Sequence, residues 1–524
     1  MTNKFSDYYT SLRKSRYFLP LVFILTFGLS FFYNLGDTPL FDRDEGAFSE
    51  ATREMLERGD FVSTYLNDEP RYDKPIFIYW FQAASVSVFG INEFGFRFPS
   101  AVFASLWVLT VFFFVKKELK EDIALKSALI MATSMWVVVI GRAAIADALL
   151  NLLITLSIFS YYKYVRYSEK KFLYLVFLWS GLGFLTKGPI AVIVPVAVSF
   201  IYMVSLKRFK EWLIHVFNPL GILLFLSIAM PWYIVQYLKE GQPFIDGFIL
   251  RHNVQRFTSA LEGHRGSIFY YIPVLLVILL PFSSLLIKTT GKIKDMFKDN
   301  LDRFLWIWFL FIFVFFSLAG TKLPHYVLYG SPPLFILMAK YSDRLKSRFW
   351  ALFPSILFVT VILFLPDIIK LILPSVTDVY AKAMLEGGWH AFDLKYRLIS
   401  GTVLVIGILF IFLKKFPADK IVIAMGYILT FYILTIVAPT VGEVNQQPIK
   451  NAAAFATENN LELVIWKLDN PSFSVYRQKV TPIRKPKDGE IAITKITKLN
   501  KFAEYEVLFK QGGIVIVKVI RTAD

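Results

Sequence analysis

The chain has 524 residues and a formal net charge of +17, from 57 Lys and Arg against 40 Asp and Glu. Apolar residues make up 56% of the sequence and charged residues only 19%, which is too little charge to cover soluble domains of this size. This composition excludes a soluble enzyme, a disordered chain and a nucleic-acid-binding protein. The absence of cysteine also excludes disulfides, thiol nucleophiles and thiolate metal sites.

Apolar runs recur along the chain as far as residue 440, with basic clusters between them. The first run, 18–32, lacks a small-residue cleavage site and is expected to remain as a span. Later runs lie near 97–115, 123–141, 145–165, 172–187, 188–206, 214–237, 268–287, 304–319, 324–339, 349–372, 397–413 and 420–440. Because basic clusters favour the cytoplasmic side, their parity predicts about 13 spans, with the N-terminus inside and the C-terminus outside. The short apolar segment 75–89 is then expected to lie in the outer interface.

Two regions are predicted to lie outside the membrane. Residues 36–96 form an external loop within a transmembrane domain that covers 1–440, and residues 441–524 form a small α/β domain. In that tail we expect a helix at 448–459 and strands at 461–467, 490–496 and 513–520, where β-branched residues alternate. The predicted fold class is therefore mainly α, a polytopic transmembrane helical bundle with interfacial helices in its first external loop.

Charged residues remain on the predicted outer face after the cytoplasmic clusters are set aside. Many lie beside span ends, where charge is costly and usually functional. They are Asp42, Arg43, Asp44, Glu45, Arg71, Asp73, Lys74, Arg142, Asp147, Lys187, Arg251, His252, Arg256, His264, Arg265 and Lys322. Carboxylates and cations together at the outer membrane surface suit an anionic lipid headgroup and acid–base chemistry. The alternative is that these residues are interfacial anchors.

Residues 44–58 are predicted to form an amphipathic helix that lies on the membrane, with Asp44 as its N-cap and Gly59 as its stop. Three acids within four residues, at 42–45, exceed what a cap needs, so a functional role for Asp44 stays open beside the capping role. The segment 186–189 is interpreted as a tight turn between two spans, with Lys187 touching lipid headgroups. Pro332 and Pro333 are interpreted as a kink that lines a cavity.

An ordered set of motifs runs through the chain. Its members are Asp44-Glu45, Glu50, Arg53-Glu54-Met55, Gly59-Asp60, Tyr72-Asp73-Lys74-Pro75, Gly141-Arg142 with Asp147, Leu185-Thr186-Lys187-Gly188-Pro189, His252-Asn253 with Arg256-Phe257, and Lys322-Leu323-Pro324 with Tyr326. The set resembles the polytopic glycosyltransferases of GT-C type in the protein O-mannosyltransferase superfamily, specifically their aminoarabinose–lipid A transferase branch. Ala47 and Phe48 stand where that branch tends to carry Arg and Tyr, a departure that bears on the sugar and not on the reaction class.

The resemblance implies transfer of a sugar from a polyprenyl-phosphate donor, such as undecaprenyl phosphate, at the periplasmic face of a bacterial inner membrane. Lipid A, another glycolipid or a protein hydroxyl would be the acceptor. By the same resemblance Asp44 and Asp147 are catalytic, and the donor phosphate is bound by Lys74, Arg256, Tyr326 and Lys322. A divalent metal ion is also implied at Asp73, with His252 as the expected second ligand and His264 as the alternative.

A transporter or flippase of lipid-linked saccharides is the alternative function. It predicts repeated halves, broken helices and charges at mid-membrane depth. The sequence shows no internal repeat, and its outer charges cluster at span ends, so an enzyme is favoured. The polar tail shares no charged motif with this set, and it is expected to shape acceptor access without supplying a catalytic group.

Overall fold

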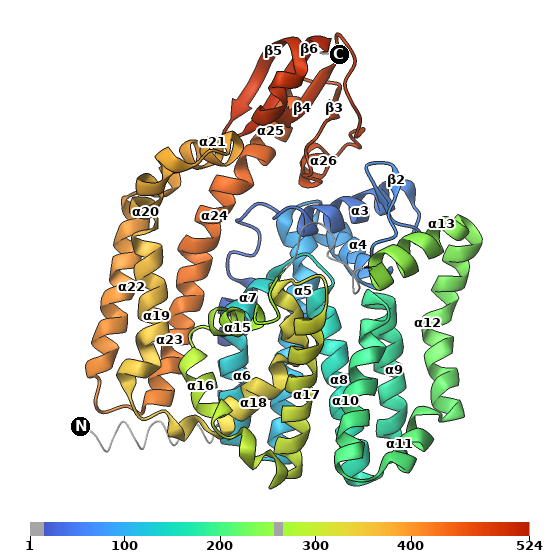
Figure 1. Cartoon of the computed structure of the whole chain (residues 1–524), viewed down its shortest axis with the longest axis vertical. Coiled ribbons are helices and arrows are strands. Elements are labelled where there is room, and N and C mark those ends of the chain that lie inside the picture. Colours follow the sequence, from blue (N-terminus) through green and yellow to red (C-terminus); the bar gives the residue numbers. More distant parts are fainter. Residues whose placement is uncertain (1–14, 256–265, 523–524) are drawn as a thin grey trace.

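The computed structural model describes residues 15–255 and 266–522, and it is mainly helical, with a small sheet at one end (Figure 1). Six helices in these residues are long and apolar enough to cross a membrane, or eight if each of two bent pairs is one span. The six are α5 (Glu93–Glu118), α8 (Asp147–Tyr167), α12 (Pro219–Glu240), α17 (Asn300–Leu318), α22 (Leu394–Phe412) and the continuous stretch Ala418–Asn445 formed by α23 (Ala418–Tyr432), η8 (Ile433–Val437) and α24 (Ala438–Asn445). The mainly α, polytopic fold class is thus confirmed, whereas the count of 13 spans stays a prediction.

Several predicted spans are short or divided helices. The bent pairs are α6 (Glu121–Ala132) with α7 (Met135–Arg142), at 65°, and α19 (Arg348–Leu363) with α20 (Leu365–Ile372) and η6 (Leu373–Ser375), at 52°. The run 268–287 divides into α15 (Tyr271–Ile278) and α16 (Ser283–Thr290) around Pro281, which has no backbone N–H to donate. Other predicted spans contain α2 (Phe18–Phe27) with η1 (Gly28–Phe32), α9 (Lys170–Lys187), α10 (Ile190–Ser205), α11 (Phe209–Val216) and α18 (Ser331–Lys340).

The prolines at 332 and 333 do not form the kink that the sequence suggested. They occupy the first turn of α18, directly after the 3-10 helix η4 (Pro324–Gly330). Proline is tolerated there because the first turn of a helix has no intrahelical acceptor for its N–H groups.

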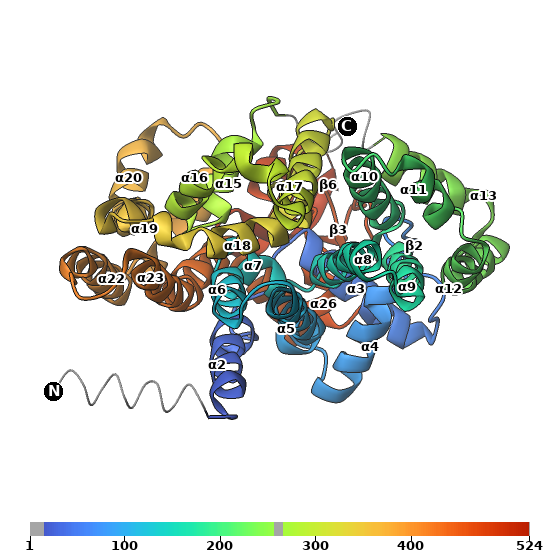
Figure 2. The ribbon, with the colours of Figure 1, turned by 90° about the horizontal axis from the view of Figure 1, so that it is seen from below.

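The helices stand side by side in a broad layer. Figure 2 shows α19, α22 and α23 at one end of this layer and α9, α11 and α12 at the other, with α5, α8 and α17 between them. One large core of buried apolar residues joins the central helices, and it includes Trp107 of α5, Phe159 of α8 and Trp308 of α17. The middle of the layer is therefore its most buried part, since α8 and α17 are more buried than the outlying helices α12 and α22.

The first external segment forms α3 (Asp44–Arg58), the short strands β1 (Tyr65–Leu66) and β2 (Glu69–Pro70), and α4 (Phe77–Phe89). Helix α3 ends at Gly59, whose φ of 65° stops it as expected. The N-cap is Arg43 and not Asp44, and no side-chain capping bond is present. Asp44 is therefore the first helical residue, and its carboxylate is not used as a cap.

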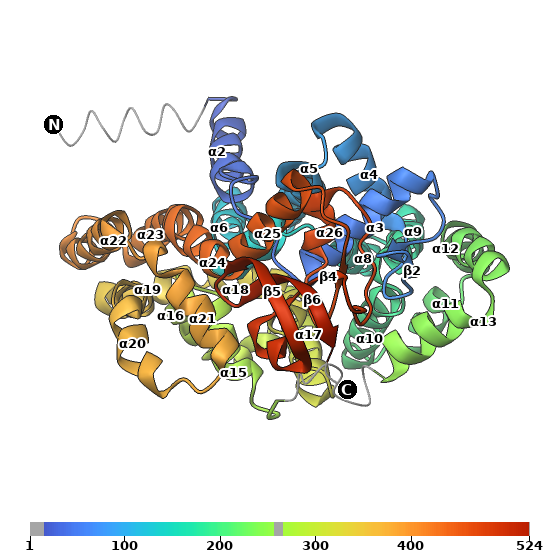
Figure 3. The ribbon, with the colours of Figure 1, turned by 90° about the horizontal axis from the view of Figure 1, so that it is seen from above.

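Helix α3 is buried on nearly all sides and does not lie on the membrane surface with an exposed polar face. Its polar residues are paired internally, since Arg53 binds Glu50 at 2.8 Å and Glu57 at 2.7 Å. The reason is a cover that the sequence did not reveal. Helix α26 (Ser472–Arg477) of the C-terminal region packs on α3 from the outer side, as Figure 3 shows from above.

The C-terminal region contains α25 (Gln447–Glu458), α26 and a four-stranded sheet with the strand order β3-β4-β6-β5. Strand β3 (Leu463–Ile465) pairs in parallel with β4 (Ile491–Lys495), and β6 (Ile514–Thr522) pairs antiparallel with β4 and with β5 (Phe502–Gln511). The expected helix and three strands are present. Strand β5 was missed because it is a largely exposed, bulged edge strand without a regular alternation of apolar residues.

A segment outside the predicted tail also belongs to this core. Helix α21 (Val379–Gly387) lies between two membrane helices in sequence, yet its Met384 is buried among residues of α25 and the sheet. The backbone N–H of Gly513 points to the sulfur of Met384 at 3.2 Å. The outer domain is thus connected to the membrane layer in two ways. The chain enters the domain directly from α24, and α21, from an earlier part of the chain, packs in its core.

One buried ion pair anchors the external loop to the membrane layer. Arg97 of α5 donates to both carboxylate oxygens of Glu45, at 2.8 and 2.7 Å, and to the carbonyls of Leu35, Thr38 and Pro39. Glu45 also accepts the N–H of Phe41 at 2.8 Å and that of Ala144 at 2.7 Å. Although burial disfavours the charged carboxylate, the adjacent guanidinium outweighs it and keeps the pKa of Glu45 below its ordinary value.

A second polar contact ties the loop to the C-terminal domain. Asp42 accepts hydrogen bonds from the backbone N–H and the hydroxyl of Ser472 and, at 2.9 Å, from the amide of Asn470. Next to it, Arg43 pairs with Asp469 at 2.6 Å. Burial raises the pKa of Asp42 to about 7, although the bonds from Ser472 and Asn470 act in the opposite direction. The C-terminal domain therefore holds Asp42, two positions before Asp44, by hydrogen bonds.

We predict that Glu45→Gln lowers the free energy of unfolding by about 3–5 kcal/mol, because it leaves the buried guanidinium of Arg97 without its counter-charge. The matched control is Glu462→Gln, which breaks an ion pair of Lys479 whose members are 81% and 52% exposed. That change is expected to cost about 1 kcal/mol or less. Thermal unfolding in detergent measures both, and equal shifts in the two variants would contradict the role given to the buried pair.

The pKa of Asp42 predicts a pH-dependent stability. Because the folded-state pKa of about 7 lies above the ordinary aspartate value of 3.8, the folded protein keeps a proton that the unfolded chain releases. The contribution of Asp42 to the free energy of unfolding is greatest below pH 3.8. It falls as the pH rises from 3.8 to about 7 and stays constant above that. In Asp42→Asn this fall is absent, so the variant gains unfolding temperature relative to wild type between pH 5 and pH 8. A difference between the two proteins that does not change with pH would refute the assignment.

Candidate functional site

A buried charged cluster lies at the outer end of the central helices. Asp147 begins α8, and the amine of Lys187, the last residue of α9, lies 2.8 Å from each of its two carboxylate oxygens. From η4, the Tyr329 hydroxyl donates to Asp147 at 2.9 Å and His325 Nε2 lies 3.8 Å from the same oxygen. Residues of α8, α9 and the distant η4 thus meet at one carboxylate.

This cluster corrects the expected role of Lys187. The segment 186–189 is indeed a turn between α9 and α10, but the side chain of Lys187 is only 13% exposed and is bound to Asp147. Tyr329 and His325 were not singled out from the sequence. The sequence does place His and Tyr residues together after the proline that follows Lys322. Their partner Asp147, however, lies about 180 residues earlier in the chain, so the pairing could not be predicted.

Asp44 lies beside a second group of charges in the external loop. Arg71 donates to the carbonyl of Ala47 at 3.1 Å, to the Tyr79 hydroxyl at 2.7 Å and to Asp73 at 3.1 Å. The negative charge of Asp44 also acts on Arg71 and helps to raise its pKa, against the opposing effect of burial. Asp44 itself is exposed, and its carboxylate makes no hydrogen bond to the residues that the structure describes.

Asp73 and Lys74 bind each other directly. The Lys74 amine lies 2.7 Å from one carboxylate oxygen of Asp73, while Arg71 holds the other. Both oxygens of the expected metal ligand are therefore bound by cations. Within the described part of the chain no group of three or more His, Asp or Glu side chains is arranged for a metal ion. The side chain of His252, and all of Arg256 and His264, lie outside the described residues.

The remaining predicted donor ligands have different surroundings. The amine of Lys322 donates to the carbonyls of Ser317 and Ala319 at 2.9 and 2.6 Å, where it satisfies the C-terminal end of α17. Tyr326 packs against Phe316, and the Lys187 amine lies 5.8 Å from the centre of its ring. Tyr326 thus adjoins the Asp147 cluster, whereas Lys322 acts as a helix cap in this structure.

A pocket of about 260 Å³ connects the two charged groups. It is lined by the loop residues 41–45, by Arg142 and Ile145 near the α7–α8 connection, by His325, and by Ile433 and Leu434 of η8. Asp44 contributes one wall, and His325 leads to Asp147. Of the two predicted catalytic carboxylates, Asp44 therefore lines the pocket, whereas Asp147 lies behind His325, 3.8 Å from its Nε2.

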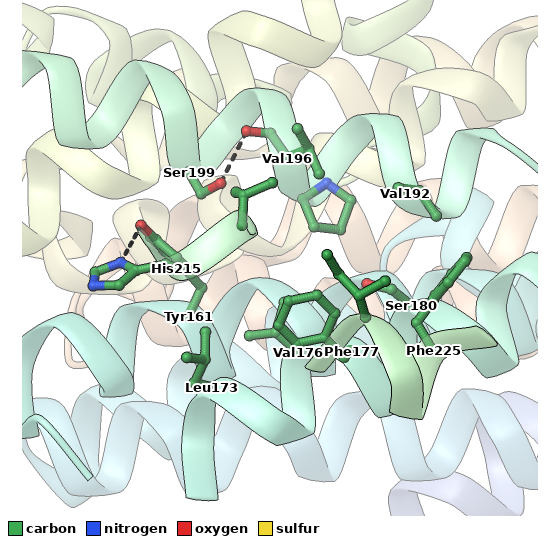
Figure 4. Close-up of a pocket in the computed structure, with 13 residues that line it drawn as sticks. Tyr161, Leu173, Val176, Phe177, Ser180, Val192, Val196, Ser199, His215 and Phe225 are labelled. Carbon is green, nitrogen blue, oxygen red and sulfur yellow. Dashed lines mark hydrogen bonds between the residues drawn. The ribbon is translucent and has the colours of Figure 1, made fainter. Parts of the chain in front are cut away.

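A second pocket, of about 180 Å³, lies between α8, α9, α10, α11 and α12 (Figure 4). Its lining is almost entirely apolar. The Tyr161 hydroxyl and His215 Nδ1, 3.2 Å apart, bind each other, and Ser199 donates to the carbonyl of Val196. With its polar groups satisfied internally and with no carboxylate in its lining, this pocket lacks the chemistry of a transfer site.

Known proteins share both the sequence and the fold of this chain. Residues 73–235 match the family model described as dolichyl-phosphate-mannose-protein mannosyltransferase. This chain is 31% identical to a curated relative from Yersinia pestis (strain Pestoides F) and 30% identical to one from Serratia proteamaculans (strain 568). Both relatives are named undecaprenyl phosphate-alpha-4-amino-4-deoxy-L-arabinose arabinosyl transferase. Each alignment covers 62% of this chain, and it spans only 58% and 59% of those two relatives.

Solved structures extend the likeness to nearly the whole chain. The crystal structure of ArnT from Cupriavidus metallidurans bound to undecaprenyl phosphate superposes with a TM-score of 0.80 at 19% identity, covering 96% of this chain and 98% of that one. An oligosaccharyltransferase from Archaeoglobus fulgidus gives a TM-score of 0.51 at 11% identity, over 92% of this chain and 70% of that one. The chain is thus similar over residues 73–235 to the dolichyl-phosphate-mannose-protein mannosyltransferases, resembles the aminoarabinose transferases over part of their length, and shares the fold of ArnT.

Proposed function

We propose that this chain is an integral-membrane glycosyltransferase that moves a sugar from a polyprenyl-phosphate donor to an acceptor at the outer face of the membrane. The observation that carries this proposal is a pocket lined by the unbonded carboxylate of Asp44 and by His325, whose Nε2 lies 3.8 Å from Asp147. The names of the curated relatives describe arabinosyl transfer with an undecaprenyl phosphate sugar, which supports the same function. A lipid or protein that offers an oxygen nucleophile would be the acceptor.

The chemistry follows from the charges. The acceptor oxygen attacks the first carbon of the sugar, the bond from that carbon to the donor phosphate oxygen breaks, and the polyprenyl phosphate leaves with the electron pair. Asp44 takes the proton of a hydroxyl acceptor or, for an acceptor that is already ionised, stabilises positive charge on the sugar. Asp147 orients Lys187 and Tyr329 by accepting a hydrogen bond from each. Lys74 and Arg256 are proposed to meet the departing phosphate.

Asp73 and His252 are proposed to bind a divalent ion, which the transfer mechanism described above does not require. An ion there would have to replace Lys74 or Arg71 on the Asp73 carboxylate. Displacing Lys74 would free its amine for a phosphate.

The proposed compartment is the inner membrane of a bacterium, with the site on the periplasmic side. The apolar helices support a multi-pass membrane protein, and the basic clusters favour this orientation. A transporter of lipid-linked saccharides is the competing function. It would move the donor without breaking its sugar–phosphate bond, so sugar transfer in a purified system distinguishes the two.

The orientation is tested with single cysteines, which is straightforward because the native chain has none. We expect Gln478→Cys, on the exposed surface of the outer domain, to react with a membrane-impermeant maleimide in intact spheroplasts. Lys298→Cys, at an exposed position in a predicted cytoplasmic loop, should react only after permeabilisation. The reverse labelling pattern would invert the topology and remove every proposed site residue from the periplasm.

The catalytic role of Asp44 is tested by Asp44→Asn. Because Asp44 makes no capping bond, this change removes a negative charge without disturbing the start of α3. We expect transfer to fall by about 10²–10⁴-fold, the scale of general acid–base catalysis, with unchanged thermal stability. Asp68→Asn is the matched control in the same loop, since its carboxylate is 74% exposed and pairs only with Arg58 at the surface. An active Asp44→Asn protein would move the catalytic role to Asp147.

Lys74→Ala separates donor binding from catalysis. The amine would meet the lipid phosphate before and during the reaction, so we expect both the affinity for undecaprenyl phosphate and the turnover to fall. Titration of the lipid into protein in nanodiscs measures the affinity directly. Donor affinity equal to that of wild type would take Lys74 out of the phosphate site.

A further inference from the structure

The apolar pocket of about 180 Å³ is bounded on one side by α11, which two hydrogen bonds attach to its neighbours. The Trp212 indole N–H donates to the hydroxyl of Ser199 on α10 at 3.0 Å, and His215 binds the Tyr161 hydroxyl of α8 at 3.2 Å. Helices α10 and α12 both pack against α9, and α11 joins them in the chain. The pocket between these helices is therefore a defined part of the fold (Figure 4).

This pocket is open to the surroundings of the helices. Val196 of α10 lines it and is also 36% exposed, and Phe225 of α12, on another side of the wall, is half-buried. Apolar cavities of about 150 Å³ stay free of water and bind small apolar molecules. Because the pocket has a similar volume and lies among predicted spans, hydrocarbon and not water reaches its opening. An apolar chain is therefore the kind of ligand that fits it.

The pocket is far from the proposed transfer site. Asp147 is the first residue of α8, and Tyr161 in the pocket wall lies about 21 Å further along the helix axis. Likewise, Lys187 ends α9, whereas the pocket is lined by residues from Leu173 to Ser180 of that helix. The end of α10 nearest α11 leads into the basic loop 207–210, which the charge bias of membrane proteins places on the cytoplasmic side.

Two lysines at the start of α11 indicate which lipid would carry the chain. Lys207 and Lys210 are exposed, and neither forms an ion pair among the residues that the structure describes. Arg208 pairs with Glu211 at 2.5 Å, so this pair adds no net charge. Lys210 precedes His215 in the pocket wall by about 8 Å along the helix. Basic sites beside transmembrane helices on the cytoplasmic side bind anionic lipid headgroups.

The outer surface of α11 also suits the level of the headgroups. Phe209, Ile214 and Phe217 are exposed, although the helix carries Lys210 and Glu211 as well. A short helix with apolar residues on one face and charges on another lies in the membrane interface. Headgroup, lysines and pocket opening therefore come to the same side of the membrane.

We propose that this pocket binds an acyl chain of an anionic phospholipid from the cytoplasmic leaflet, with the headgroup at Lys207 and Lys210. The site does not depend on the proposed sugar transfer. A polyprenyl chain of the donor is the other occupant to consider. Its phosphate is expected beside Lys74 on the outer side, so it would leave both lysines without an anion. The acyl chain fills a void between α9, α10 and α12 and so adds dispersion contacts to the folded protein.

The test uses the full-length protein in phosphatidylcholine nanodiscs that contain phosphatidylglycerol with a diazirine in its acyl chain. After illumination, we expect labels on Leu173 and Ser180, which line the pocket and are too buried for lipid at the outer surface of the helices to reach. Val196→Trp narrows the opening and should lower this labelling about 10-fold or more. Val192→Phe, in the same wall, carries the test if Val196→Trp does not fold.

Ile193→Trp is the matched control for the added bulk. Ile193 lies on the same helix and is 42% exposed, but it does not line the pocket, so labelling of Leu173 and Ser180 should equal that of wild type. Absence of label from both residues in wild type, or equal labelling in Val196→Trp and Ile193→Trp, would overturn the proposal.

The headgroup is tested by Lys207→Gln combined with Lys210→Gln. In wild type, phosphatidylglycerol should label the pocket about 10-fold more than phosphatidylcholine with the same diazirine chain, the scale of two lysines near an anion. The double variant should lose this preference. Lys414→Gln with Lys415→Gln, two exposed lysines of another predicted cytoplasmic loop, should keep it.

Two outcomes would assign the pocket differently. Equal labelling by the two phospholipids in wild type would refute the role of the lysines and with it the anionic lipid. Loss of the label on adding undecaprenyl phosphate, with no loss on adding the same amount of unlabelled phosphatidylglycerol, would assign the pocket to the donor chain and overturn the proposal. Sugar transfer is not measured in any of these experiments, so the proposed function stands or fails separately.

Discussion

The ion pair between Glu45 and Arg97 determines where both carboxylates of the proposed site stand. Glu45 directly follows Asp44, and its Oε1 accepts the N–H of Ala144, three residues before Asp147. All five N–H groups of Arg97 are used, on Glu45 and on the loop carbonyls. Burying such a pair is costly in itself, and full hydrogen bonding is the condition under which it is retained. Geometry at the site thus depends on one interaction that takes no part in the chemistry.

Most other charges around the site are also committed before any ligand arrives. Lys187 binds Asp147, Lys74 binds Asp73, and Arg43 binds Asp469. This arrangement holds the side chains in place and lowers the reorganisation that charge development in a reaction would otherwise require. Asp44 and Arg142 differ from the rest because one has an unbonded carboxylate and the other an unbonded Nη1. The shared pocket therefore holds two polar groups without a bonding partner among the described residues, while the charges around it are already paired.

Sequence reasoning succeeded where the signal was local. Apolar runs predicted the long helices, and Gly59 predicted the end of α3 from its ability to adopt a positive φ. It failed where the determining partner lies far along the chain. Lys187 and Asp147 are separated by 40 residues and Arg97 and Glu45 by 52, so neither pairing leaves a trace in periodicity or spacing. The burial of α3 could not be predicted either, because its cover, α26, comes from beyond residue 470.

The contact between Asp42 and Ser472 has a consequence for biosynthesis. The two residues are 430 positions apart in the chain. At about 5–20 residues per second, a ribosome needs roughly 20–90 seconds to reach the second after it has made the first. During that time the loop with Asp44 has left the ribosome without the contact that holds its neighbour. This contact forms only after the chain has been made as far as Ser472, so a chain that ends earlier lacks the bond that holds Asp42 beside Asp44.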